Sequence, residues 1–410
     1  MIRHFFKIVW NRRRANTLIL VEMVLSFLVL CLVFTLAGSA LLNWGKPLGF
    51  DYHDVWCLDL ATPSAHAFAI GKSADPEVKR AYEHLHATLR GIPEVEAVTP
   101  LSWNHPFSGS SAGNQTYVGG ARVSVRQSRV LPEAMQVLRF TLVDGRWLEP
   151  GDATLAWVPV VVTRSYARAL FGDRNPLGQR LHILRRDGTP ESDPKDPERR
   201  VVGVIEDYRS QGEVYPTRPA EFAPLRSERL TTLAGQYLVR LAPGVPAAFE
   251  RELVEAVRAA APGYGVTVRP LAQMRTESLQ QVLVPMLLIG VLAGFMMLMV
   301  GLGLAGVLWQ NVTRRTRELG LRRALGATAS QVRWQVIGEL LAITTVGVGV
   351  GAALYLQLPL LPLFPSTPLA AYLLALTAAV VVLYALAVLC GLYPGWMATR
   401  VRPAEALQNE

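Results

Sequence analysis

The sequence predicts an α-helical membrane protein with four transmembrane helices and a large α/β extracytoplasmic domain between the first and the second helix. Of the 410 residues, 51% are hydrophobic and the mean hydropathy is +0.26, which is too apolar for an ordinary soluble chain of this length. The apolar residues gather in four stretches that are almost free of charge. The long segment between the first two stretches has strand-like and helix-like patterns instead.

The chain begins with a basic segment, residues 1–16, which is followed by the first predicted span, residues 17–42. A hydrocarbon core about 30 Å thick requires about 20 helical residues, and this span is long enough. A cleaved secretory signal is the alternative, because Gly38, Ser39 and Ala40 resemble a cleavage site. The apolar run exceeds the roughly 7–15 residues of a signal peptide, so we expect a retained anchor.

Three further spans are predicted at residues 282–310, 334–357 and 369–393. The loop 358–368 contains no charged residue, whereas the loop 311–333 contains six arginines: Arg314, Arg315, Arg317, Arg322, Arg323 and Arg333. Because short loops rich in arginine stay in the cytoplasm, we expect the loop 311–333, the N-terminal segment and the tail 394–410 to be cytoplasmic. The segment 43–281 then lies on the far side of the membrane, and the loop 358–368 is external.

The net charge of +9 and the pI of about 9.7 would suit a nucleic-acid-binding protein. The basic excess lies beside the spans, however, and the external segment carries nearly equal numbers of basic and acidic residues. We therefore expect lipid rather than nucleic acid as a partner. Two carboxylates, Glu22 and Glu339, interrupt the spans, and they either reach the headgroup layer or pair with a neighbouring subunit.

The external segment is predicted to contain two βαβ-like flanks, residues 43–100 and 235–281. In the first, strand-like residues 55–60 and 95–98 bracket a helix over 76–90. In the second, residues 236–241 and 265–270 bracket a helix over 245–260. We expect the flanks to form one α/β subdomain into which a strand-rich subdomain, residues 101–234, is inserted. Within this insert, residues 116–125 are strand-like and the polar stretch 185–200 predicts a mobile loop.

No motif for catalysis, nucleotide binding or metal binding satisfies its requirements. Residues 71–73 spell Gly-Lys-Ser, but the phosphate-binding loop needs a glycine where this chain has His66. Residues 109–113 spell G-x-S-x-G without the strand before and the helix after that a nucleophile elbow requires. His84 and His86 are two residues apart in a predicted helix and face different ways. We therefore expect no catalytic residue, no metal and no cofactor in this chain.

The loop after the second span contains a short basic amphipathic pattern. Leu321, Ala324, Leu325 and Thr328 recur at helical spacing with arginines beside them, and Gly326 is a plausible helix end. By its physical pattern alone, such a helix either lies among lipid headgroups or docks a partner.

Several segments of the sequence also resemble those of a known protein family. "RTRELGLRRALGA" at 315–327 resembles the cytoplasmic motif of the FtsX-like permease family of ABC transporters, with Leu319 where isoleucine is common. "DGRWLEPGD" at 144–152, "VVVTRSYARALFGDRNPLGQRL" at 160–181 and "VVGVIEDYRS" at 201–210 resemble the MacB-type periplasmic core domain. The tail at 400–410 also resembles the C-terminal tail of this family, so the resemblance covers essentially the whole chain.

The resemblance implies the permease subunit of a bacterial ABC transporter of the mechanotransmission type (type VII), resident in the inner membrane. Two copies of a separate ATPase would bind ATP and Mg²⁺, because no ATPase domain is fused to the permease. A second permease, identical or paralogous, and possibly a periplasmic adaptor protein would complete the complex. The implied docking residues are Arg317, Glu318, Leu319, Gly320, Leu321, Arg322, Arg323, Ala324, Leu325, Gly326 and Ala327.

Export of antimicrobial compounds or peptides is the expected task. The alternatives are lipoprotein extraction or activation of a cell-wall hydrolase by the same machinery, and an extracytoplasmic sensor without an ATPase. Polar residues that would line a channel are nearly absent from the spans, which argues against a solute pore.

Two features of the spans bear on helix packing. Residues 273–281 are polar but run without a helix breaker into residue 282, so the second helix is predicted to project beyond the bilayer. Gly290 and Gly294, and likewise Gly347 and Gly351, have the spacing that permits close helix contacts. Such contacts form either within the chain or between subunits, and the spacing does not distinguish the two.

Overall fold

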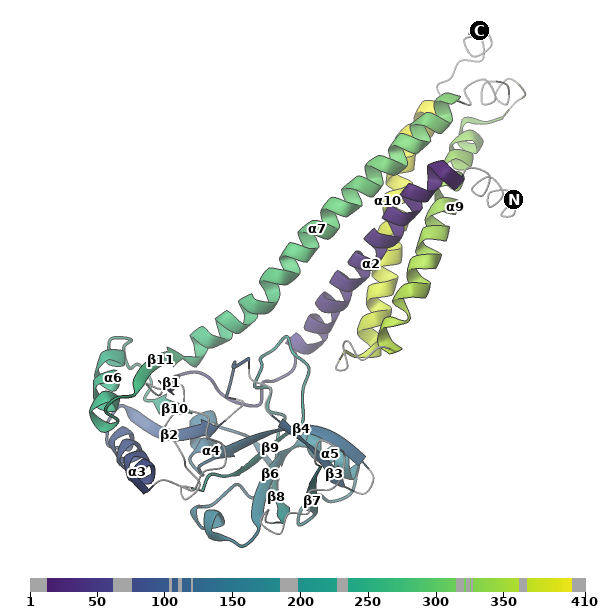
Figure 1. The fold of residues 1–410 in the computed structure, drawn as a ribbon. Helices are drawn as coiled ribbons and strands as arrows, with labels where there is room; N and C mark the ends of the chain where they lie inside the picture. Colours follow the sequence, from purple (N-terminus) through teal and green to yellow (C-terminus); the bar gives the residue numbers. More distant parts are fainter. Residues whose placement is uncertain are drawn as a thin grey trace. The chain divides into compact units, whose positions relative to one another are not determined.

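The structure, a computed structural model, describes residues 13–61, 76–102, 105–109, 113–118, 121–184, 198–226, 235–314, 321, 325, 327–360 and 367–399. The chain divides into two compact units. Asn43–Gln281 form one unit, the external domain. Met1–Leu42 and Val282–Glu410 form the other, the membrane unit (Figure 1).

Four helices of the described residues are long and apolar enough to cross a membrane. They are α2 (Arg13–Trp44), α7 (Leu271–Arg314), α9 (Ala329–Tyr355) and α10 (Leu369–Thr399), with the short helix η3 (Leu358–Leu360) after α9. The prediction of four transmembrane helices is confirmed. α9 begins before the predicted span because the Thr328 hydroxyl caps the Gln331 backbone N–H, and the Gln331 side chain accepts from the Thr328 N–H.

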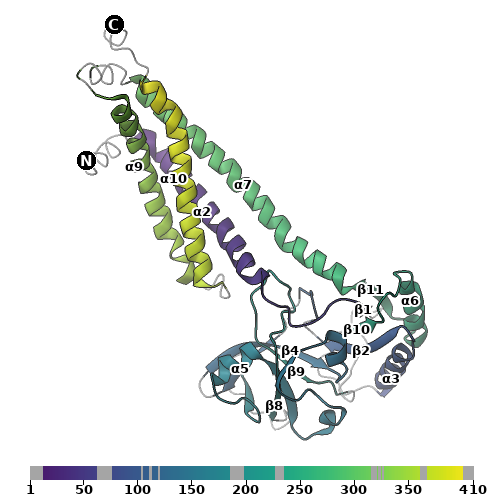
Figure 2. The same ribbon diagram turned by 180° about the vertical axis from the view of Figure 1, so that it is seen from behind.

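Two apolar clusters hold the membrane unit together. In one, Met23 of α2, Val300 of α7, Leu340 of α9 and Ala387 of α10 meet in a buried core. The other joins α2, α9 and α10, which lie close together in both views (Figures 1 and 2). The residues of α7 from 282 to 299 are mostly exposed, whereas its later turns pack against the other helices.

The strands of the two flanks of the external domain alternate in one four-stranded part of the sheet. Strands β1 (Val55–Ala61), β2 (Val95–Ser102), β10 (Gly235–Leu241) and β11 (Gly265–Pro270) lie in the order β11-β1-β10-β2, and each neighbouring pair is antiparallel. Helices α3 (Pro76–Arg90) and α6 (Phe249–Ala260) pack together on this sheet (Figure 2). This is a split βαβ, or ferredoxin-like, topology.

The second of these helices begins at Phe249, four residues later than the sequence predicts. Residues 242–248 form turns instead, in which the Val245 N–H bonds the Ala242 carbonyl and Gly244 has a φ of 87°. Glycine adopts this left-handed conformation without the steric cost that other residues incur, so the chain turns here before the helix starts.

The insert adds seven strands to the same sheet. They are β3 (Gly113–Val118), β4 (Ala121–Val130), β5 (Leu142–Gly145), β6 (Val158–Thr163), β7 (Arg180–Leu184), β8 (Arg199–Ile205) and β9 (Ala220–Pro224). Their order is β4-β3-β7-β8-β6-β9, and β9 pairs back with β4, so six strands form a closed ring of pairings. The helices of the insert are α4 (Ala134–Leu138), η1 (Pro150–Thr154) and α5 (Arg164–Phe171).

The strand-like residues 116–125 do not form one continuous strand. These residues belong to two antiparallel strands, β3 and β4, in which Val118 pairs with Ala121. Gly119 and Gly120 separate the two strands, and a glycine pair is typical of a two-residue hairpin connection. Of the predicted mobile loop 185–200, residues 185–197 lie outside the described residues.

One apolar core of the external domain joins its flanks to the insert. Here Phe50, Phe107, Phe140, Tyr208 and Phe222 make a continuous set of aromatic contacts with ring centroids 5.0–5.6 Å apart. Phe50 comes from the segment that follows α2, and the other four come from the insert. Leu271 and Met274 at the start of α7 belong to the same core. This core therefore gathers the segments that lead to and from the membrane helices.

Candidate functional site

The candidate site lies where the external domain holds the two segments that connect it to membrane helices. The first is the linker, residues 45–54, between α2 and β1. The second is the start of α7. Both contact a third stretch, residues 206–215, which follows β8 and which we call the bracket segment.

Arg209 of the bracket segment holds the linker through its side chain and its backbone. Its Nη1 donates to the Lys46 carbonyl at 2.8 Å, and its backbone N–H donates to the Leu48 carbonyl at 2.9 Å. Its Nη2 donates to the carbonyls of Glu213 and Tyr215 at 2.6 and 2.7 Å. Burial lowers the pKa of this guanidinium, and Glu213 and Asp207 oppose that shift. Arg209 therefore ties the linker to a turn that it also stabilises.

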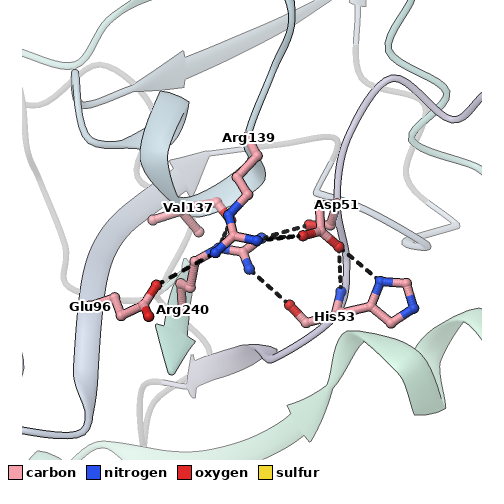
Figure 3. Close-up of polar contacts among 6 residues, drawn as sticks. All are labelled: Asp51, His53, Glu96, Val137, Arg139 and Arg240. Carbon is pink, nitrogen blue, oxygen red and sulfur yellow. Dashed lines mark hydrogen bonds and ion pairs between the residues drawn. The ribbon is translucent and has the colours of Figure 1, made fainter. Parts of the chain in front are cut away.

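Arg240 of β10 holds the other end of the linker (Figure 3). Its side chain is 2% exposed, and its Nε, Nη1 and Nη2 donate to the carbonyls of Val137, His53 and Asp51 at 2.8, 3.0 and 3.1 Å. The Asp51 carboxylate lies 3.4 Å from Arg240 and 3.2 Å from Arg139. The buried positive charge is thus surrounded by carbonyl oxygens and faces one carboxylate.

Asp51 is held in its charged form. Burial alone would raise the pKa of its carboxyl group, but the hydrogen bonds from His53 and the charge of Arg240 outweigh burial and lower it. Its backbone N–H donates to the Leu138 carbonyl at 2.9 Å. Asp51 is therefore fixed by α4, β10 and its own neighbour in sequence.

Gly49 allows the linker to approach the bracket segment closely. It has a φ of 79°, and a Cβ at this position would lie 1.9 Å from the Asp207 carbonyl oxygen. Any side chain would both strain the backbone and clash with a backbone atom. The linker and the bracket segment are thus in direct backbone contact.

The start of α7 is anchored on the other side of the bracket segment. Leu271 and Met274 are 0% and 3% exposed. Arg275 Nε donates to Glu213 Oε1 at 2.5 Å, its guanidinium lies 5.3 Å from the Tyr52 ring centroid, and Ser278 Oγ donates to the Gln211 carbonyl at 3.2 Å. Residues 206–215 therefore contact both membrane connections.

Most of the predicted docking helix lies outside the described residues: Arg317, Glu318, Leu319, Gly320, Arg322, Arg323, Ala324 and Gly326. Leu321 and Leu325 are described, and they are 51% and 80% exposed. The Leu325 N–H donates to the Leu321 carbonyl at 3.0 Å, the spacing of an α-helical bond. Ala327 packs against the apolar cluster that joins all four membrane helices.

The two pairs of glycines predicted to pack helices have different surroundings. A Cβ at Gly347 would lie 3.2 Å from Met23 Cβ, and one at Gly351 would lie 2.5 Å from Phe27 Cδ1, so both glycines of α9 face α2. A Cβ at Gly290 or Gly294 would meet nothing within 4 Å.

The remaining sequence candidates do not assemble into a chemical site. No group of three His, Cys, Asp or Glu within the described ranges could hold a metal ion. His86 stacks on Tyr82 with ring centroids 6.0 Å apart, and Cys57 is buried, which raises the pKa of its thiol to about 12. Residues 71–73 and the serines of the 109–113 motif lie outside the described residues.

Two family models match the chain, one within the external domain and one within the membrane unit. The model of the MacB-like periplasmic core domain matches residues 61–256, and the model of the FtsX-like permease C-terminal region matches residues 290–403. The chain is an FtsX-like permease with a MacB-like periplasmic core domain. The resemblance inferred from the sequence is thereby confirmed.

Curated relatives of this permease carry export names. The macrolide export ATP-binding/permease protein MacB of Chlorobium luteolum is 25% identical over 278 residues, which are 65% of this chain and 40% of that protein. The pyoverdine export ATP-binding/permease protein PvdT of Pseudomonas savastanoi pv. phaseolicola is 25% identical over 354 residues, 83% of this chain and 50% of that protein. The permease chain spans about half the length of the curated relatives it matches.

Solved structures also resemble the permease. The periplasmic region of MacB from Actinobacillus actinomycetemcomitans has 15% identity and a TM-score of 0.38, covering 55% of this chain and 92% of that one. The extracellular domain of the noncanonic ABC-type transporter YknZ from Gram-positive bacteria has 16% identity and a TM-score of 0.34, covering 52% and 99%. With TM-scores this low, the fold assignment rests on the strands and helices described above.

Sequence reasoning did not single out the residues that hold the permease's two connections. Arg209 stands within the quoted stretch 201–210, but there it served only as part of a family resemblance. Arg240 offered a usable signal, because it is a charged residue inside the apolar strand pattern of residues 236–241. A charge in such a strand is rarely buried without partners, and here its partners are carbonyls far away in sequence.

Proposed function

We propose that this chain is the permease of a bacterial ABC exporter that works by mechanotransmission. A separate ATPase binds and hydrolyses ATP with Mg²⁺ on the cytoplasmic side, and the resulting movement changes the conformation of the external domain. The export names of the relatives and the two family matches support the exporter part of this proposal.

The length and continuity of α7 carry the mechanical part. A helix of 44 residues is about 66 Å long, more than twice the roughly 30 Å of a hydrocarbon core. Its first turns are buried in the external domain, and its last residue, Arg314, opens the arginine-rich loop. We take this continuous helix, which contains Pro285, as the element that relays a push from that loop to the bracket segment.

The interior of the membrane unit supports transmission rather than passage of a solute. In the part of the spans that the structure describes, the buried side chains with a polar group are Ser26, Thr35, Thr344, Tyr355 and Tyr372. Thr35 and Thr344 bond the carbonyls one turn earlier in their own helices, and Thr35 also bonds the Tyr355 hydroxyl. A few hydroxyls, bonded mainly to their own helices and to each other, do not line a hydrophilic path. Substrate would then be handled by the external domain, in the periplasm or the outer leaflet.

The partners follow from the same scheme. Residues 317–327 dock one of two ATPase subunits, and both termini face the cytoplasm. The open side of α7, which includes Gly290 and Gly294 and is rich in exposed leucines, meets lipid or a second permease, identical or paralogous. A periplasmic adaptor protein contacts the external domain, and antimicrobial compounds or peptides are the exported class.

Interrupting α7 tests the proposal. A Gly-Gly-Ser insertion between Gln281 and Val282 makes a flexible joint, while the same insertion in the external loop 358–368 is the control. We expect the first variant to reach the membrane and bind its ATPase but to export at background level in a whole-cell efflux assay, with the control close to wild type. Normal export by the first variant would refute mechanotransmission through α7.

A further inference from the structure

Arg126 of β4 is a buried arginine whose guanidinium makes one hydrogen bond within the described residues. It is 7% exposed, and its Nη1 donates to Ser210 Oγ at 2.8 Å. Its Nε and Nη2 have no hydrogen-bond partner among the described residues. Arg240, by contrast, satisfies Nε, Nη1 and Nη2 with three carbonyls. Buried polar groups are nearly always bonded, so the two free donors of Arg126 call for an acceptor.

Within the described residues, the charge of Arg126 has no recorded counter-charge. The described groups that act on it electrostatically are the exposed guanidinium of Arg218, which has the same sign, and the buried phenol of Tyr208. Burial, followed by the repulsion from Arg218, lowers the pKa of Arg126 to about 10, so the side chain is still charged at neutral pH. A buried charge without a counter-charge costs free energy, and an anion between the two arginines would relieve both the burial and the repulsion.

The neighbouring hydroxyl completes a donor set. Ser210 is 2% exposed and its Oγ accepts the bond from Arg126, which leaves its own hydrogen able to donate. The backbone beside it is already engaged, since the Phe107 N–H donates to the Ser210 carbonyl and the Arg126 N–H donates to the Pro219 carbonyl. Two guanidinium N–H groups, a hydroxyl and a second guanidinium are the donors that carboxylates and phosphates accept from.

We propose that Arg126, Ser210 and Arg218 form a binding site for the carboxylate or phosphate group of a ligand. The site lies at the bracket segment, because Ser210 stands between Arg209, which holds the linker, and Gln211, whose carbonyl accepts from Ser278 of α7. An anion bound there contacts the stretch that touches both membrane connections. The proposal concerns binding to the external domain and holds whether or not the transport mechanism is correct.

Calorimetric titration of the full-length chain in detergent, at low chloride, tests the site with two probes, inorganic phosphate and acetate. We expect saturable binding of at least one probe to the wild type, and about tenfold or greater weakening in Arg126→Gln, which removes a charged donor pair. The matched control is Arg122→Gln, an exposed arginine four residues earlier on the same strand, and it should bind as the wild type does.

Two further variants keep the test informative if Arg126→Gln fails to fold. Ser210→Ala and Arg218→Gln should each weaken binding several-fold while the far-UV circular dichroism spectrum stays unchanged. Binding of phosphate alone or of acetate alone identifies the ligand group. Absence of saturable binding of both probes to the wild type would overturn the proposal, and so would equal losses in Arg122→Gln and the site variants.

Discussion

The two arginines that hold the linker use backbone carbonyls as their main partners. Arg240 donates to three carbonyls from two separate segments, and Arg209 donates to three from the linker and its own turn. A guanidinium presents its donors in a fixed planar fork, so it fixes the relative positions of the segments it bridges. At the scale of single residues, the connection to the membrane helices thus depends on two buried side chains.

Replacing Arg240 with alanine should destabilise the external domain by about 2–5 kcal/mol, because the carbonyls of Val137, His53 and Asp51 lose their donor and Asp51 loses a buried counter-charge. Urea unfolding of the purified chain, followed by tryptophan fluorescence, measures this change. Arg139→Ala removes an exposed arginine that pairs with the same carboxylate, and it should cost less than about 1 kcal/mol. Equal costs for the two variants would show that Arg240 does not hold the linker.

Residue-level roles were the hardest to predict from the sequence. The motif 317–327 stood out because its arginines and apolar residues recur locally. Arg209, Arg240 and Arg126 bond to partners 84 to 189 residues away in the sequence, and no local pattern reveals such contacts. Burial of a charge can be suspected from a strand pattern, but its partners follow only from the fold.

Helices and strands were predicted more accurately than the roles of single residues, because helices and strands depend on local sequence patterns. Four helices followed from long charge-free stretches, and α3 was bounded by its proline and by Gly91. The differences arose at Gly244, where a turn precedes a helix that begins later than predicted, and in the strand-like residues 116–125, which belong to two strands. The interleaved strand order β11-β1-β10-β2 was not predictable, since it depends on pairing between residues almost 200 positions apart.

Packing between α2 and α9 should be sensitive to the size of residue 351. In Gly351→Ala the new Cβ would lie 2.5 Å from Phe27 Cδ1, so α2 or the ring must move, at a cost of about 1–3 kcal/mol. Gly349→Ala is the control, because a Cβ there meets nothing within 4 Å and alanine favours a helix. Thermal unfolding in detergent should give a lower midpoint for Gly351→Ala than for Gly349→Ala. A reversed order would mean that the two helices do not pack through this glycine.

At the scale of the whole molecule, the chain consists of a membrane unit with little buried polarity and an external domain with several buried arginines. Two chain connections join them, through the linker and through α7, and the bracket segment contacts both. The family matches cover both units and agree with this division. We propose that movement driven by a partner ATPase travels along α7 and arrives at residues 206–215.

Hydrogen–deuterium exchange of the complete complex, with and without a non-hydrolysable ATP analogue, most directly measures whether this movement reaches residues 206–215. We expect nucleotide to change the exchange of backbone amides in residues 45–54 and 206–215 of the wild type, and to leave these amides unchanged when Gly-Gly-Ser is inserted between Gln281 and Val282. If nucleotide leaves these amides unchanged in the wild type, or changes them equally in the insertion variant, the account is contradicted.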